Sequence, residues 1–154
     1  MDAAEQVPAT LLTAIDHVGL AVPDLDAAIA FHTSVLGLEL RHREENVEQG
    51  VAEAMLAVAG PDGEAMPGTQ VQLLAPLSEA SPLTRFLERS GPGLQQLAYR
   101  VTDVAAASDV LRLRGLRLLY DAARVGTRGS LINFLHPKDA GGVLIELVES
   151  PPTE

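Results

Sequence analysis

IDHVGLAVPDLDAA, residues 15–28, reads as a strand, a turn and the start of a helix, and it decides the fold because the chain repeats it. The stretch LQQLAYRVTDVAAA, residues 94–107, has the same order seventy-nine positions later. Such a duplication indicates two equivalent halves. His17 falls opposite Gln96, and polar side chains at equivalent positions of apolar strands suggest a site built from both halves.

Each half continues with three more strands, so the expected unit is βαβββ. Asp24 is expected to cap the first helix, and Gly37 to end it. In the first half we expect strands at residues 15–22, 38–45, 51–58 and 69–75. In the second half we expect a helix at 103–114 and strands near 94–101, 116–120, 130–135 and 142–148.

The predicted fold class is α+β, with the two tandem modules forming a curved mixed sheet around a metal-centred cavity. A length of 154 residues suits one domain. We expect this domain to span 15–149, with module one at about 15–77, a linker helix at about 81–90 and module two at about 94–149. Residues 1–14 are expected to be a loose leader, and 150–154 a tail.

Composition excludes several classes of function. A net charge of −10 argues against nucleic acid and anionic membranes as partners. The chain has no cysteine, so disulfides, thiolate metal sites and a cysteine nucleophile are excluded. The first residues are acidic and lack the basic start of a targeting peptide, so we expect a cytoplasmic protein.

Four polar residues lie on strands whose other positions are mostly apolar. His17 and Gln96 are on the first strand of each half, and Gln72 and Glu146 are on the last. One imidazole, two amide oxygens and one carboxylate would suit an octahedral divalent cation better than a tetrahedral structural zinc. The alternative is that all four are ordinary polar residues at strand edges.

Glu53 is a fifth candidate because it shares a strand face with the apolar Val51 and Met55. Burial would raise the pKa of its carboxyl group toward that of a useful base. An exposed strand glutamate is the alternative. The remaining histidines have no partner in the repeat, and we interpret them as surface or loop residues: His32, His42 and His136.

Five motifs together resemble one family. They are IDHV (15–18), REENVEQGV (43–51), VQLLAPL (71–77), INFLHPK (132–138) and GVLIEL (142–147). The tandem βαβββ order resembles the vicinal oxygen chelate superfamily, and within it the chain is similar to the methylmalonyl-CoA epimerase family. The resemblance covers about 15–149.

This resemblance implies a function and a set of site residues. The family's metal-binding positions fall on His17, Gln72, Gln96 and Glu146, and its proton-transfer carboxylates fall on Glu53 and Glu146. The family implies one divalent metal ion per chain, cobalt first, with manganese, magnesium, nickel or zinc as alternatives. It also implies an acyl-CoA thioester substrate, epimerisation at C2 through an enolate, and a homodimer.

Two departures from the family pattern bear on the site. Many members have two histidines where this chain has Gln95 and Gln96, so the third ligand would be an amide oxygen, which favours harder metal ions. An arginine common in the family is Leu131 here, and Arg128 or Ser130 is expected to substitute for it.

Three alternative functions differ in the residues that they require. A glyoxalase I-like lyase usually has two carboxylates among its metal ligands, whereas Gln72 stands where one is expected. An extradiol dioxygenase needs two histidines on the inward face, and only His17 is available. A metal-free, ligand-sequestering protein of the drug-resistance type would need neither a metal nor Glu53.

Overall fold

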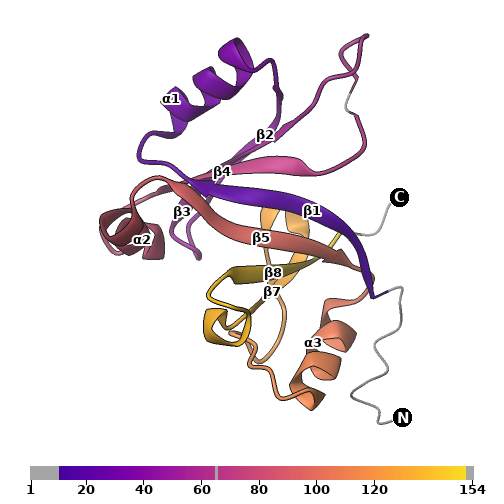
Figure 1. Ribbon diagram of the computed structural model, residues 1–154. Coiled ribbons are helices and arrows are strands. Elements are labelled where there is room, and N and C mark those ends of the chain that lie inside the picture. The colour runs from indigo at the N-terminus through magenta and orange to yellow at the C-terminus, as the bar shows by residue number, and fades with distance from the viewer. Residues whose placement is uncertain (1–10, 65, 152–154) are drawn as a thin grey trace. The chain divides into compact units, whose positions relative to one another are not determined.

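The computed structural model describes residues 11–64 and 66–151, and its elements confirm the predicted α+β class (Figure 1). The order βαβββ occurs twice. The chain divides into two compact units. The first unit is His17–Gln95, and the second combines the chain up to Asp16 with the chain from Gln96.

The first unit has a four-stranded mixed sheet in the order β2-β3-β4-β1, in which β1 is parallel to β4 and the other pairs are antiparallel. The strand β1 starts before this unit, at Leu12. The elements are β1 (Leu12–Ala21), α1 (Leu25–Ala30), the π-helical η2 (Phe31–Val35), β2 (Glu39–Asn46), β3 (Val51–Ala57), β4 (Gln70–Pro76) and α2 (Pro82–Ser90).

The helix α1 covers one face of this sheet. Asp24 is its N-cap, as predicted, because the carboxylate accepts a hydrogen bond of 3.0 Å from the backbone N–H of Ala27. Leu25 packs with Leu56 and Leu73, both completely buried. This apolar layer occupies alternate positions of β3 and β4, so the side chains between them point to the other face.

The helix α2 packs against that other face. It forms where the linker helix is predicted, with Ser81 as its N-cap and Pro82 in its first turn. Leu83 contacts a cluster that includes Ala21 and Leu74. One end of the face opposite α1 is therefore closed by α2.

The second unit has a sheet in the order β5-β8-β7-β6, in which β5 is parallel to β8 and the other pairs are antiparallel. Its elements are β5 (Gly93–Val101), α3 (Val104–Leu113), β6 (Arg124–Val125), the short 3-10 turns η3 (Thr127–Gly129) and η4 (Pro137–Asp139), β7 (Leu131–Leu135) and β8 (Leu144–Glu149).

The helix α3 covers one face of the second sheet (Figure 1). Asp103 caps α3 through the N–H of Ala106, repeating the cap of α1. Val104 and Ala107 pack on Leu147 of β8. Glu146, the preceding residue, therefore points to the opposite face.

The predicted strand near 116–120 is wrong. Only one isolated bridge joins this segment to β7, between Leu118 and Leu135, and the two-residue strand β6 forms later. The cause is Asn133, whose side chain accepts from the N–H of Tyr120 at 3.1 Å and donates to its carbonyl at 3.0 Å. The side-chain amide thus replaces the backbone ladder at this point.

The predicted loose leader is too long, because β1 begins at Leu12 and Leu11 is 7% exposed in the α3 cluster. Leu11 packs there because it is apolar and directly precedes the strand. The rest of the leader, residues 1–10, and the tail positions 152–154 lie outside the described residues. In the described part of the chain, no helix is long and apolar enough to cross a membrane.

Candidate functional site

Three of the predicted site residues share one face of the first unit's sheet. Gln72 is in register with Gly19 on β1 and with Met55 on β3, so it faces the same way as His17 and Glu53, each two residues from its partner. This is the face opposite α1. His17 is 2% exposed, Gln72 3% and Glu53 4%.

Gln72 and Glu53 form a buried hydrogen-bonded pair. The amide Nε2 of Gln72 donates to Oε2 of Glu53 at 3.0 Å. This contact satisfies part of the hydrogen-bonding need of a carboxylate that water scarcely reaches. Because the nitrogen of the amide donates to Glu53, the other amide atom is the carbonyl oxygen Oε1. This oxygen is the atom through which a glutamine binds a metal.

The second unit contains a matching pair. Gln96 on β5 is in register with Leu144, two residues before Glu146 on β8, and both side chains face away from α3. Nε2 of Gln96 donates to Oε2 of Glu146 at 3.1 Å. Gln96 is 5% exposed and Glu146 is 6% exposed. Each unit therefore contains one buried carboxylate held by one glutamine amide.

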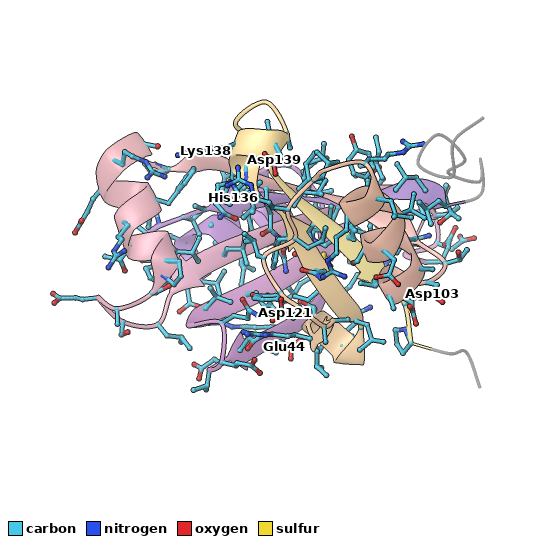
Figure 2. The ribbon with its side chains drawn as sticks, turned by 90° about the horizontal axis from the view of Figure 1, so that it is seen from below. Glu44, Asp103, Asp121, His136, Lys138 and Asp139 are labelled. Atoms are coloured by element: carbon cyan, nitrogen blue, oxygen red, sulfur yellow. The ribbon has the colours of Figure 1, made fainter. Side chains whose placement is uncertain are left out.

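Two polar residues of the first unit were not recognised as site residues from the sequence. Glu44 on β2 is directly opposite Glu53, and His42 is opposite Met55, so both lie on the face of the Gln72–Glu53 pair (Figure 2 labels Glu44). His42 lies within β2 with a side chain that is 31% exposed, which fits a surface position, but it shares its face of the sheet with the Gln72–Glu53 pair.

The register of β2 explains why His42 was missed. The pairing with β3 shifts between Leu40 and His42, which places Leu40 on the α1 face and His42 on the opposite one. A regular strand would put the two on the same face. The two-residue spacing of His42 and Glu44 can be read from the sequence, but the site of the register shift in β2 cannot.

The register partners of Glu146 on both adjacent strands are apolar. Ala98 on β5 and Phe134 on β7 are its register partners, with exposures of 0% and 8%. The ring of Tyr120 meets the ring of Phe134 edge to face at a centroid distance of 5.9 Å. The guanidinium of Arg124 lies 3.9 Å from the centroid of the Tyr120 ring.

The residues expected to replace the missing arginine lie in the loop before β7. Arg128 has a φ of 57°, in the left-handed region that few residues other than glycine adopt. Ser130 is 6% exposed, and its hydroxyl donates to the carbonyl of Thr127 at 2.8 Å. The expectation that either residue binds substrate stays a prediction.

His136 and His32 serve local structure. His136 Nδ1 accepts from the N–H of Lys138 at 3.2 Å and so caps η4, the turn that also contains Asp139 (Figure 2). His32 Nδ1 lies 2.8 Å from the carbonyl of Ala28, one helical turn earlier. Both fit the interpretation as residues outside the site.

The four predicted ligands suit a divalent cation by their chemistry. The amide oxygens of Gln72 and Gln96, the carboxylate of Glu146 and the imidazole of His17 are ligand types that divalent cations accept. All four side chains are buried and lie on strands. Residues 11–64 and 66–151 contain no group of three or more His, Cys, Asp or Glu side chains placed to hold a metal ion.

Comparison with known proteins confirms the family resemblance. The family model of the Glyoxalase/Bleomycin resistance protein/Dioxygenase superfamily matches residues 16–134. The ethylmalonyl-CoA/methylmalonyl-CoA epimerase of Cereibacter sphaeroides is 37% identical over 135 residues, covering 86% of this chain and 95% of that protein.

Two solved structures are also similar. The crystal structure of methylmalonyl-CoA epimerase from Mycobacterium tuberculosis is 52% identical with a TM-score of 0.87, covering 98% of this chain and 97% of that one. A structure of methylmalonyl-CoA epimerase in complex with methylmalonyl-CoA and NH4+ is 46% identical with a TM-score of 0.84, covering 93% of this chain and 98% of that one.

Proposed function

We propose that this chain, which belongs to the methylmalonyl-CoA epimerase family of the glyoxalase/bleomycin resistance protein/dioxygenase superfamily, interconverts the two C2 epimers of methylmalonyl-CoA. The observation that carries the proposal is the pair of buried carboxylates, Glu53 and Glu146, each held by a glutamine amide. Burying a carboxylate costs free energy even when one hydrogen bond partly offsets the cost, so two such groups favour a functional role.

Epimerisation explains why two carboxylates are needed. The proton at C2 lies next to a thioester carbonyl, so a base can remove it and leave an enolate. Inversion requires that a proton return to the opposite face, which one fixed group does not easily reach. We assign Glu53 to one face of C2 and Glu146 to the other.

Gln72 and Gln96 orient the two bases. Each amide binds one oxygen of its carboxylate, at 3.0 and 3.1 Å respectively, which restricts rotation of the carboxylate that exchanges a proton with C2. Holding an acid–base group in one geometry is a large part of its catalytic effect.

A divalent cation completes the proposal. His17, Gln72, Gln96 and Glu146 would hold it, with cobalt the first expectation and manganese, magnesium, nickel or zinc the alternatives. When bound, such an ion would supply Lewis-acid stabilisation of the enolate oxygen. The homodimer and the cytoplasmic location stay predictions.

Proton NMR tests the proposed reaction directly. Chelator-treated protein is mixed with methylmalonyl-CoA in D₂O, first alone and then with added cobalt. The proposal expects loss of the C2 proton signal, faster with cobalt. No loss under any divalent ion would contradict the proposal and favour a ligand-binding protein.

Metal content gives a second measurement that does not depend on activity. Elemental analysis after dialysis against cobalt should find one ion per chain in the unmodified protein and markedly less in Gln72→Ala and Glu146→Gln. Unchanged cobalt in both variants would contradict the ligand assignment.

A further inference from the structure

Glu44 stands where a strand pair normally avoids a second negative charge. It is in register with Glu53 across the antiparallel pair β2–β3. Directly opposite side chains on one face have Cβ atoms about 5 Å apart, and like charges there destabilise the sheet. A local arrangement that costs stability is a reason to look for a function.

The surroundings of the two carboxylates differ in a consistent way. Glu53 is 4% exposed and receives the amide of Gln72. Glu44 has a side-chain exposure of 33%, and its Oε1 lies 3.0 Å from Nε2 of His42, itself 31% exposed. On this face of the sheet, the buried carboxylate of Glu53 therefore lies opposite a carboxylate, that of Glu44, which is in contact with water.

We propose that Glu44 is a relay residue that transfers protons between Glu53 and solvent, with His42 positioning the carboxylate of Glu44. The inference rests on the proposed function of Glu53 as a base. After Glu53 has taken the C2 proton, its O–H bond breaks and a new O–H bond forms on the Glu44 carboxylate, directly or through one water molecule. Glu53 returns to the carboxylate form, Glu44 releases the proton to bulk water, and no electrons are gained or lost.

The register partners of Glu146 are of a different kind. They are Ala98 and Phe134, neither of which has a carboxylate. Glu44 lies opposite Glu53, so the relay that it provides should affect that base and leave Glu146 unchanged.

Deuterium incorporation measured separately for each epimer tests the relay. Starting from one pure epimer in D₂O, the deuterium content of recovered substrate is compared with the amount of product formed. This ratio reports how often a proton on the base exchanges with solvent before it returns to C2. The epimer served by Glu53 is the one whose exchange is lost in Glu53→Gln.

Glu44→Gln should lower this ratio about tenfold for the epimer served by Glu53 and leave it unchanged for the other, because only one base loses its proton carrier. Acetate in the buffer should restore exchange in proportion to its concentration, since a small carboxylic acid can replace the missing group. A purely structural role for Glu44 predicts neither selectivity nor rescue.

Glu45→Gln is the matched control. Glu45 is the next residue of β2, is exposed, and pairs with Ala52 on the other face, so the change removes the same charge without touching the relay. The ratio should equal that of the unmodified protein. His42→Gln should lower the ratio less than Glu44→Gln does, and it tests the relay independently if Glu44→Gln does not fold.

The outcomes separate the relay from the proposed function. If Glu53→Gln retains exchange from both epimers, the proposed function of Glu53 fails. If Glu53→Gln behaves as expected while Glu44→Gln and His42→Gln leave the ratio unchanged, or lower it equally for both epimers, the relay alone is overturned.

Discussion

The two units bury the same chemical pair in different surroundings. In the first unit Gln72 holds Glu53, and the sheet continues from Glu53 to a second carboxylate on the edge strand β2. In the second unit Gln96 holds Glu146, which lies on the inner strand β8 between Ala98 and Phe134. One carboxylate thus has a second carboxylate among its register partners, and the other has apolar register partners.

This difference shows that a duplicated fold need not give two equivalent bases. The repeat relates Gln72 to Glu146 and His17 to Gln96, yet Glu53 has no counterpart in the second half. The Gln72–Glu53 and Gln96–Glu146 hydrogen bonds are therefore alike in chemistry, but the residues that form them are not equivalent in the repeat. We infer that the duplication supplied the scaffold and that individual strands supplied the two proton-transfer groups.

The largest expected effect comes from removing either carboxylate. Glu53→Gln and Glu146→Gln should each lower the epimerisation rate by about 10²–10⁴-fold, the usual contribution of general acid–base catalysis. The rate is measured by coupled conversion of one pure epimer. Glu146→Gln should also lower cobalt content, whereas Glu53→Gln should not, and full activity in either variant would refute its assignment.

The next effect concerns the amides. Gln72→Leu and Gln96→Leu each leave a buried carboxylate without its donor, which should cost about 1–3 kcal/mol in the free energy of unfolding. Urea denaturation measures this cost. Because Glu53 also lies opposite the like-charged Glu44 on β2, we expect the cost to be larger for Gln72→Leu, and an equal cost would remove this distinction between the units.

A smaller effect is expected from the two hydrogen bonds that join Asn133 to the backbone of Tyr120. Asn133→Ala removes both hydrogen bonds to Tyr120, whose ring packs against Phe134 beside Glu146. Loosening this ring should admit water near Glu146 and raise deuterium exchange for the epimer that Glu146 serves. The other epimer is the internal control, and a rise in both would show a general loss of structure.

The smallest effect concerns acid stability of the second unit. The Arg117 guanidinium, hydrogen-bonded to Asp139, lowers the pKa of that carboxyl group from 3.8 to about 2. A lowered pKa stabilises the fold above the unfolded value, and the contribution is lost as the pH falls through about 2.

The Asp139→Asn variant tests this contribution. Its Tm should be slightly lower than that of the unmodified protein at pH 5, and the difference should shrink as the pH falls toward 2. Since the guanidinium of Arg117 is exposed, the difference should also shrink in high salt. A difference independent of pH would show that packing, rather than charge, is responsible.

Much of the fold was predictable because local rules governed it. The caps Asp24, Ser81 and Asp103 each precede a helix that formed where expected. Alternation of apolar residues likewise predicted which faces of the strands carry His17 and Gln96. These patterns depend on residues that are close together in the sequence, so they can be recognised in a single sequence.

The wrong predictions share one physical cause. Contacts between segments far apart in the sequence cannot be inferred from the local residue pattern. The shift in β2 places His42 beside the site, and the side chain of Asn133 prevents a regular strand at residues 116–120. The opposition of Glu44 and Glu53 follows from the four-residue connection between Asn46 and Val51. The turn in that connection is fixed by the amide of Asn46, which accepts from the N–H of Gln49.

Each buried carboxylate is proposed to serve one face of C2. The decisive experiment is deuterium exchange from each pure epimer of methylmalonyl-CoA, measured by NMR in D₂O on Glu53→Gln and on Glu146→Gln. We expect each variant to lose exchange from one epimer, and the two variants to lose it from opposite epimers. Loss of exchange from the same epimer in both variants would contradict this proposal.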